Sequence, residues 1–402
     1  MDYLTVHEMA QRWQISERLV QKYCAQGRIA GAQKFGAAWG IPDNAIKPED
    51  LRKLNNLVET DNHTEIMPQE QEYRRLMPLM NTAFRPGTCR ESIQRITDST
   101  QQALALAEYY YFSGQPEITT QKIEPYLTSP DLDSRLSAYL LYIFASLSLG
   151  QYRRARYTLD ALKEMLARGA KSNPNLRAAE SFISTTAIVL LHLPLPKELP
   201  KIQDFLRTLP PGIRFFALYV QAHYLYLQEA YDKSLGMVEA AFAMGAQDYP
   251  IPAIYLHLVA VMDCMSLRQT ENAKIHLMEA WALAQPDDLI EGFGEHHGLL
   301  GGMLEAVIKP SWPEDFKRII TITYRFSKGW RKIHNHDTGH DVADNLTTTE
   351  FAVSMLAARG WTNQEIANHM NISPNTVKRH LSTAMQKLDI TKRQELKKYM
   401  LQ

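Results

Sequence analysis

The stretch that decides the fold at one end of the chain is residues 346–400, LTTTEFAVSMLAARGWTNQEIANHMNISPNTVKRHLSTAMQKLDITKRQELKKYM. Capping boxes, in which a threonine precedes Glu or Gln by three residues, predict helix starts at Thr347, Thr362 and Thr391. Ser373 before Pro374 predicts a fourth start. Left-handed residues are expected to end helices at Gly360 and Asp389. The segment therefore predicts four short helices.

The third of these helices, from Pro374 to about Leu388, has two unlike faces. One face carries an apolar stripe at helical spacing, made by Val377, Leu381, Ala384 and Leu388. The opposite face is basic and rich in amides and hydroxyls, with Asn375, Lys378, Arg379, Ser382 and Gln386. A helix of this kind after a tight turn is typical of a helix-turn-helix, whose second helix enters the major groove of DNA. The alternative interpretation is a solvated face on a structural helix bundle.

The motifs of this segment resemble the LuxR-type DNA-binding domain. The matching runs are L-T-x-x-E from Leu346, G-x-T-N-x-E-I-A from Gly360, I-S-x-x-T-V-K-x-H-L from Ile372, K-L at Lys387 and R-x-E-L from Arg393. The resemblance implies that bases are contacted by Lys378, Arg379 and Ser382, and phosphates by Asn375, Thr376 and Lys387. It also implies a last helix with dimer contacts, a homodimer on double-stranded promoter DNA, and RNA polymerase as a partner. We expect His380 to be a structural helix residue.

The other end of the chain has a second helix–turn–helix pattern. Thr5 and Glu8 form a capping box, a second helix is expected from Glu17 to about Gln26, and two strand-like runs follow at 28–35 and 38–41. This order resembles the MerR/excisionase-like winged helix. The resemblance implies a major-groove contact by Arg18, Gln21 and Lys22, and a wing that includes Gln33 and Lys34. The alternative is a winged helix used for dimerisation or protein contact.

Residues 71–331 are predicted to be helical and repetitive. Small residues and turns recur with a period of 35 or 36, as between Gly114 and Gly150, and this spacing resembles tetratricopeptide repeats. Stacked helix pairs would form an α-solenoid with a concave surface. The solenoid is rich in aromatic residues, and a hollow lined by them would suit a small-molecule effector. The candidate ligand-binding residues are Tyr109, Tyr142, Phe216, Tyr219 and Tyr255.

These patterns together predict a mainly α chain divided into five parts. The predicted parts are a DNA-binding domain at 1–47, a linker at 48–70, the helical domain at 71–331, a linker at 332–345 and a DNA-binding domain at 346–402. The net charge of zero divides into +2 for residues 1–53, +4 for residues 347–402 and −6 between them. Basic ends on an acidic centre would confine DNA contact to the ends.

Other classes of protein find no support in the sequence. We see no apolar run long enough to span a membrane, no signal peptide, and three widely spaced cysteines that predict neither disulfides nor a zinc cluster. Catalytic and nucleotide-binding motifs are missing, so no enzyme, cofactor or metal is expected. We expect a cytoplasmic transcription regulator whose helical domain senses a small molecule or partner. The alternative is a scaffold that holds a peptide or protein in the solenoid.

Overall fold

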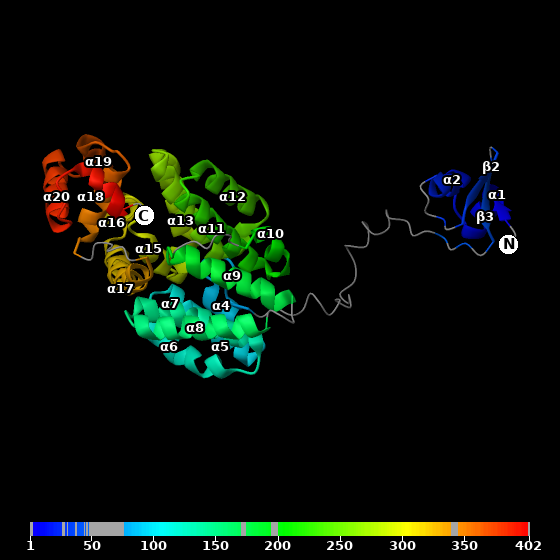
Figure 1. Cartoon of the computed structure of the whole chain (residues 1–402), viewed down its shortest axis with the longest axis horizontal. Helices are drawn as coiled ribbons and strands as arrows, with labels where there is room; N and C mark the ends of the chain where they lie inside the picture. Colours follow the sequence, from blue (N-terminus) through cyan, green and yellow to red (C-terminus); the bar gives the residue numbers. More distant parts are fainter. Residues whose placement is uncertain are drawn as a thin grey trace. The chain divides into compact units, whose positions relative to one another are not determined.

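The computed structural model divides the chain into two compact units, Met1–Ile66 and Met67–Gln402. Figure 1 shows both units as ribbons. The structure describes residues 3–25, 29, 31–36, 38–43, 45, 47, 76–169, 174–193, 200–338 and 345–400. The predicted linker at 48–70 lies outside the described residues.

The first unit combines two helices with a small sheet. Its elements are β1 (Tyr3–Thr5), α1 (Val6–Trp13), α2 (Glu17–Ala25), β2 (Gln33–Phe35) and β3 (Ala38–Pro42). The strands are antiparallel in the order β1-β3-β2, with Leu4 opposite Ile41 and Lys34 opposite Trp39. Strand β1 has no counterpart in the sequence prediction, because its place depends on pairing with a strand more than thirty residues away.

A capping box and the apolar faces of the two helices determine how this unit folds. The Thr5 hydroxyl accepts the Glu8 amide and the Glu8 carboxylate accepts the Thr5 amide, so the predicted capping box is present. The apolar faces of the two helices meet the sheet in one core that includes Met9, Val20 and Ile41. Trp39 is half-buried and packs on this core, as expected of a hairpin residue.

The second unit is helical wherever the structure describes regular elements in it. Its first part contains α4 (Cys89–Gln94), α5 (Ser99–Phe112), α6 (Pro116–Ile123), α7 (Leu132–Ser148), α8 (Tyr152–Gly169), α9 (Pro174–Leu190), α10 (Ile202–Phe205), α11 (Pro211–Leu227), α12 (Tyr231–Ala243), α13 (Pro250–Ser266) and α14 (Thr270–Ala284). Then come α15 (Glu291–His296), the π-helical turn η5 (Leu304–Ile308), α16 (Lys309–Ser311) and α17 (Pro313–Thr338). Among the described residues, no helix is long and apolar enough to cross a membrane.

Helices that are consecutive in the sequence also pack against each other in space. The helices of α5–α6, α7–α8, α11–α12 and α13–α14 lie against each other, and α5 contacts α7 as α11 contacts α13. Helix α17 departs from this local pattern because it returns to pack on α7 and α8. Gly329 on α17 approaches the backbone of Leu147 so closely that no Cβ would fit between them. The helical part is therefore closed by contacts between its last long helix and its early helices.

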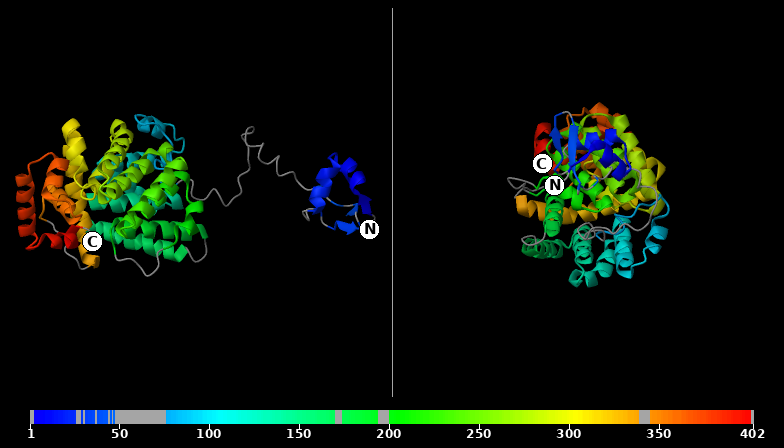
Figure 2. Two further views of the ribbon diagram at one scale, coloured as in Figure 1. Left: turned by 90° about the horizontal axis from the view of Figure 1, so that it is seen from above. Right: turned by 90° about the vertical axis from the view of Figure 1, so that its right-hand side faces the viewer.

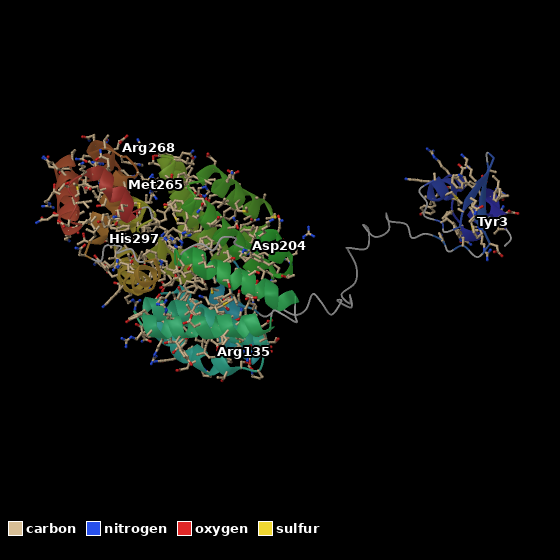
Figure 3. The ribbon with its side chains drawn as sticks, in the orientation of Figure 1. Tyr3, Arg135, Asp204, Met265, Arg268 and His297 are labelled. Carbon is tan, nitrogen blue, oxygen red and sulfur yellow. The ribbon has the colours of Figure 1, made fainter. Side chains whose placement is uncertain are left out.

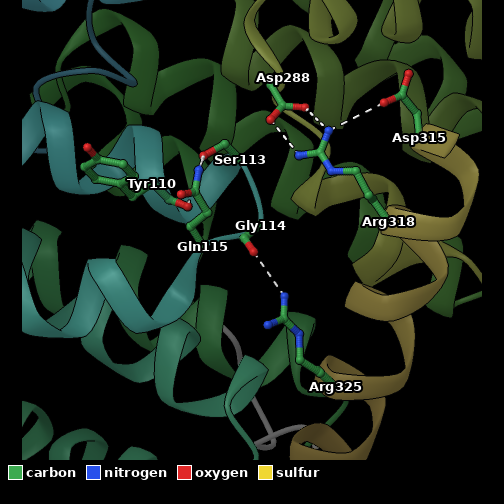
Figure 4. A network of polar contacts seen from close by, with 8 residues as sticks. All are labelled: Tyr110, Ser113, Gly114, Gln115, Asp288, Asp315, Arg318 and Arg325. Carbon is green, nitrogen blue, oxygen red and sulfur yellow. Dashed lines mark hydrogen bonds and ion pairs between the residues drawn. The ribbon is translucent and has the colours of Figure 1, made fainter.

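Two arginines hold α17 in place, Arg325 on the early helices and Arg318 on the segment that precedes α15 (Figure 4). Arg318 donates to both carboxylate oxygens of Asp288, at 2.7 and 2.6 Å, and Arg325 donates to the Gly114 carbonyl oxygen at 3.0 Å. A bidentate guanidinium–carboxylate pair fixes direction as well as distance. Helix α17 runs to Thr338, so the first half of the predicted linker at 332–345 is helical.

The C-terminal part contains α18 (Thr348–Ala358), α19 (Asn363–Met370), α20 (Pro374–Lys387), the 3-10 turn η6 (Arg393–Glu395) and α21 (Leu396–Met400). These elements lie beside α15–α17 in both Figure 1 and Figure 2, where they are orange to red. The predicted caps at Thr347, Thr362 and Ser373 are present, and Gly360 and Asp389 are left-handed. The capping box predicted at Thr391 is wrong, because the Glu395 carboxylate accepts the Thr391 and Lys392 amides.

Candidate functional site

Helices α19 and α20 form a helix–turn–helix with a well-satisfied turn. Asn371 ends α19 in a left-handed conformation with φ of 52°, and the Ile372 amide donates to the Ala367 carbonyl oxygen at 3.0 Å. Ser373 caps α20, since its hydroxyl oxygen accepts the Thr376 amide at 3.0 Å. Pro374 occupies the first turn of α20, where a missing amide hydrogen costs no bond. These contacts therefore fix the residue at which α19 ends and the residue at which α20 begins.

The two faces of α20 differ as the sequence predicts. The apolar stripe is buried, at Val377, Leu381, Ala384 and Leu388. The side chains implied as base contacts are all exposed, at Lys378, Arg379 and Ser382. His380 is half-buried, and its pKa is lowered by burial and by the charge of Arg379. This face can donate hydrogen bonds to base edges and phosphates without rearrangement of the domain.

The residues implied as phosphate contacts are placed less uniformly. Asn375 is exposed, whereas Thr376 is half-buried and its hydroxyl lies 2.8 Å from that of Ser373. The Lys387 ammonium lies 2.7 Å from the Glu350 carboxylate and so joins α20 to α18 within the domain. Lys387 therefore has a structural ion pair in addition to its implied role at DNA.

The helix–turn–helix domain packs on the helical part through a glycine-rich segment, Gly298–Gly302. A Cβ on Gly298 would overlap the ring of Phe351, and one on Gly302 would touch Met370. The Gly301 carbonyl oxygen lies 3.0 Å from the His369 imidazole. Glycines are needed here because two helices of the domain approach the backbone directly. Sequence analysis missed this surface, although the run H-H-G-L-L-G-G at 296–302 is an unusual one.

Polar contacts complete the docking surface. The Arg359 guanidinium donates to the Tyr226 hydroxyl at 2.8 Å and to the Leu299 carbonyl oxygen at 2.9 Å. Arg268 donates to the Gly360 carbonyl oxygen at 2.8 Å. Figure 3 labels Arg268, Met265 and His297 on the side of the helical part that faces the C-terminal helices. At the last helix, Lys397 lies 3.5 Å from Glu229.

Two adjoining cavities lie in the second unit. The smaller, of about 50 Å³, is walled mainly by apolar side chains that include Met80, Phe112 and Phe216. The larger, of about 190 Å³, is lined by four histidines, by α17, and by Leu346, Thr348 and Phe351 of the C-terminal domain. Both are lined by Phe144, Leu190 and Glu295. The helix–turn–helix domain thus forms part of the wall of an internal cavity.

Glu295 is the carboxylate at the junction of the two cavities. Its oxygens accept hydrogen bonds from the Tyr111 and Tyr255 hydroxyls, the latter at 2.8 Å. Burial raises the pKa of Glu295, and burial together with Glu295 raises the pKa of Glu291 to about 8. Burial is the largest cause at both carboxyls, and it is opposed by the Tyr111 and Tyr255 hydroxyls at Glu295 and by the Ser148 hydroxyl at Glu291.

A chain of hydrogen bonds follows the wall of the larger cavity. The His296 Nδ1 donates to the Gly292 carbonyl oxygen at 2.8 Å, so its Nε2 accepts from the Tyr219 hydroxyl at 2.7 Å. His223 lies 3.4 Å from the same hydroxyl and 3.3 Å from His192. Burial lowers the pKa of His223 and lowers that of His296 to about 4, so both imidazoles are neutral at pH 7.

The structure brings together three of the five aromatic residues proposed for ligand binding. Phe216 and Tyr255 line the smaller cavity, and Tyr219 lines the larger. Tyr109 and Tyr142 are buried elsewhere in the described helices, and the Tyr109 ring packs under the Arg90 guanidinium at 4.9 Å. The polar lining, above all Glu295 and the histidines, escaped sequence analysis because its residues come from distant helices.

In the first unit, the side chains proposed for DNA contact are exposed. They are Arg18, Gln21 and Lys22 on α2, and Gln33 and Lys34 on β2. The Lys34 ammonium lies 6.0 Å from the centre of the Trp39 ring.

Among the residues that the structure describes, no three metal-ligating side chains are grouped as a metal site.

Comparison with known proteins identifies the C-terminal part. Residues 344–400 match the family described as bacterial regulatory proteins, luxR family. No curated protein matches the chain. The matched range contains the helix–turn–helix of α19 and α20 and the exposed basic face of α20. The chain carries a LuxR-family helix-turn-helix domain at its C-terminus.

Proposed function

We propose that the protein is a bacterial transcription regulator that binds promoter DNA sequence-specifically through α20. The observation that carries this proposal is the exposed face of Lys378, Arg379 and Ser382 within a LuxR-family domain. Arginine and lysine at the start of such a helix can donate to guanine O6 and N7 in the major groove. Asn375 and the end of the preceding turn would set the register on the phosphates.

We extend this proposal to the first unit as a second DNA-binding head. Its helix α2 follows α1 after a short turn and exposes Arg18, Gln21 and Lys22 on one face. The hairpin of β2 and β3 exposes Gln33 and Lys34, as a wing would. Two heads on one chain would read two DNA segments, and a homodimer would present four.

The helical part would control the C-terminal head through docking. The head contacts Gly298–Gly302 with two of its helices, and Lys397 of the last helix, α21, contacts Glu229. By the family resemblance this last helix would carry the dimer contacts, so docking and pairing would use the same end of the domain. An effector that fills the cavity beside Phe351 would favour one arrangement over the other. RNA polymerase would then be contacted by the DNA-bound form.

DNA binding by the full-length protein tests the proposal. Fluorescence anisotropy with a duplex from upstream of its own gene would measure affinity against a shuffled duplex of equal composition. The double variant Lys378→Ala with Arg379→Ala should lose roughly tenfold or more in discrimination between the two duplexes, because each base contact gives roughly 1–3 kcal/mol. Its dependence on salt should also become shallower if either side chain contacts a phosphate.

A control variant separates α20 from general charge. Lys163→Ala removes an exposed lysine of α8 and should leave both affinity and discrimination unchanged. Equal loss in the Lys163 variant, or equal affinity of the native protein for every duplex, would refute sequence-specific binding by α20. The corresponding variant of Gln21 and Lys22 tests the first unit separately.

A further inference from the structure

The tyrosine hydroxyls nearest the junction of the two cavities already donate hydrogen bonds within the protein. The Tyr111 and Tyr255 hydroxyls donate to Glu295, and the Tyr219 hydroxyl donates to His296. Two threonines of the lining, Thr186 and Thr323, donate to carbonyl oxygens one turn earlier in their own helices. A ligand at the junction of the cavities therefore meets few groups that could donate a hydrogen bond to it.

Acceptors, by contrast, remain at the junction. Each carboxylate oxygen has two lone pairs, and each oxygen of Glu295 accepts one tyrosine hydroxyl. Among the described residues, no lysine, arginine or histidine lies within ion-pair distance of Glu295. The accessible part of this half-buried side chain faces the cavities, since Glu295 lines both. Glu295 at the junction can therefore accept a hydrogen bond from a cationic ligand.

Aromatic rings surround the same position. The Tyr255 ring lies 5.5 Å from that of Phe216, 5.2 Å from that of Tyr219 and 6.1 Å from that of Phe112, measured between centres. Ring faces attract ammonium groups, and they do so more strongly where water is excluded. An anionic ligand at the junction would instead approach a carboxylate that makes no ion pair with the described residues, although Arg331 lines the larger cavity alone.

We propose that the joined cavities bind a small organic amine in its ammonium form. The ammonium would donate to Glu295 at the junction, and the apolar body would lie in the smaller cavity between Met80, Phe112 and Phe216. This inference rests on the proposed sensing function and names the chemical class of its effector. Phe351 and Thr348 of the helix–turn–helix domain line the larger cavity, so an amine that extends from the junction into that cavity would contact the docked head.

Binding to the full-length native protein tests the charge requirement without any substitution. Phenethylamine is the probe, and 2-phenylethanol and phenylacetate are the neutral and anionic controls of similar shape. Isothermal titration and thermal unfolding should show saturable binding of phenethylamine, with at least roughly tenfold weaker binding of both controls, as loss of a charge-assisted bond requires. A series of straight-chain amines from butylamine to octylamine would map the length of the smaller cavity.

Two isosteric variants locate the site. Glu295→Gln should weaken phenethylamine binding by roughly tenfold or more. Glu291→Gln changes a neighbouring buried carboxylate that lies outside the lining, and it should bind the amine as the native protein does. Thermal unfolding of each variant without ligand establishes that it is folded. Equal binding of amine, alcohol and carboxylate, or no binding across the amine series, would overturn the proposal.

The DNA assay distinguishes failure of this inference from failure of the proposed function. The Lys378→Ala and Arg379→Ala double variant should bind phenethylamine normally, because neither residue lines either cavity and both side chains are exposed. Sequence-specific DNA binding without amine binding would overturn the effector class alone. Amine binding without sequence-specific DNA binding would support the site and overturn the regulator.

Discussion

Replacement of Arg359 by methionine should release the helix–turn–helix domain from the helical part. Arg359 follows α18 and donates to the Tyr226 hydroxyl at 2.8 Å and the Leu299 carbonyl oxygen at 2.9 Å. Methionine keeps most of the aliphatic stem, so packing is largely retained and both hydrogen bonds are lost. The change therefore tests the polar anchor of the docking surface.

The magnitude follows from the two bonds and the cost of burying the charge. A hydrogen bond from a charged donor contributes about 1.5–3 kcal/mol. Desolvation of the guanidinium opposes this gain, and its Nε and Nη1 have no hydrogen-bond partner among the described residues. A net loss of about 2 kcal/mol is expected, which raises the ratio of undocked to docked domain about thirtyfold.

Hydrogen exchange measured by mass spectrometry reports this ratio directly. Peptides covering 298–303 and 351–359 should exchange faster in the Arg359→Met variant, while peptides from α13 keep their native rates. Lys397→Met is the control, because it removes an exposed ion pair to Glu229 that contributes little. Unchanged exchange at both docking segments would refute the anchor. Equally faster exchange in α13 would show that Arg359 stabilises the whole unit instead.

Two further substitutions test docking and buried charge. Gly298→Ala should also open the docking surface, since the added methyl group overlaps the Phe351 ring, whereas Gly236→Ala, which meets open space on a helix, should leave exchange unchanged. If the added methyl group acts by overlapping the Phe351 ring, the double variant Gly298→Ala with Phe351→Ala should return to native exchange rates. Exchange that stays fast in the double variant would contradict this contact. Asp263→Asn tests a buried carboxyl on α13 whose pKa is raised from 3.8 to about 8, chiefly by burial. The folded protein keeps this proton while the unfolded chain releases it, so native stability falls as pH rises through this range. Relative to the native protein, Asp263→Asn should therefore gain about 2–4 kcal/mol in unfolding free energy between pH 5 and pH 8, measured by urea titration. Parallel stability curves for the two proteins would exclude this assignment.

Sequence reasoning was most accurate where the deciding contacts are local. The caps at Thr347, Thr362 and Ser373 involve residues three apart, so their patterns predict the helix starts. The box at Thr391 failed by one residue, because a nearby glutamate competed for the same amides. The basic face of α20 could be read from the period of a single helix.

Contacts between distant segments could not be predicted in this way. Strand β1 forms only by pairing with β3. The aromatic composition predicts a lined hollow, yet it does not say that Tyr219 faces one cavity while Tyr142 is buried elsewhere. Glu295 reaches the cavity from a helix more than 180 residues beyond the Tyr111 that donates to it. Such placements depend on how helices pack, which periodicity does not encode.

The return of α17 to α7 has a consequence for how this chain folds and evolves. In an open array of repeats each unit contacts only its neighbours, so units can be gained, lost or unfolded one by one. Here Asp287 accepts the Gly87 and Cys89 amides at 2.7 and 3.0 Å, and Arg325 reaches Gly114, so the early and late helices depend on each other. Deletion of one helix pair would separate these early and late contacts. We therefore expect the number of helix pairs to be fixed. Because the early helices contact α17, we expect the helical part to complete its packing only after α17 has been synthesised, shortly before the C-terminal head follows it in the chain.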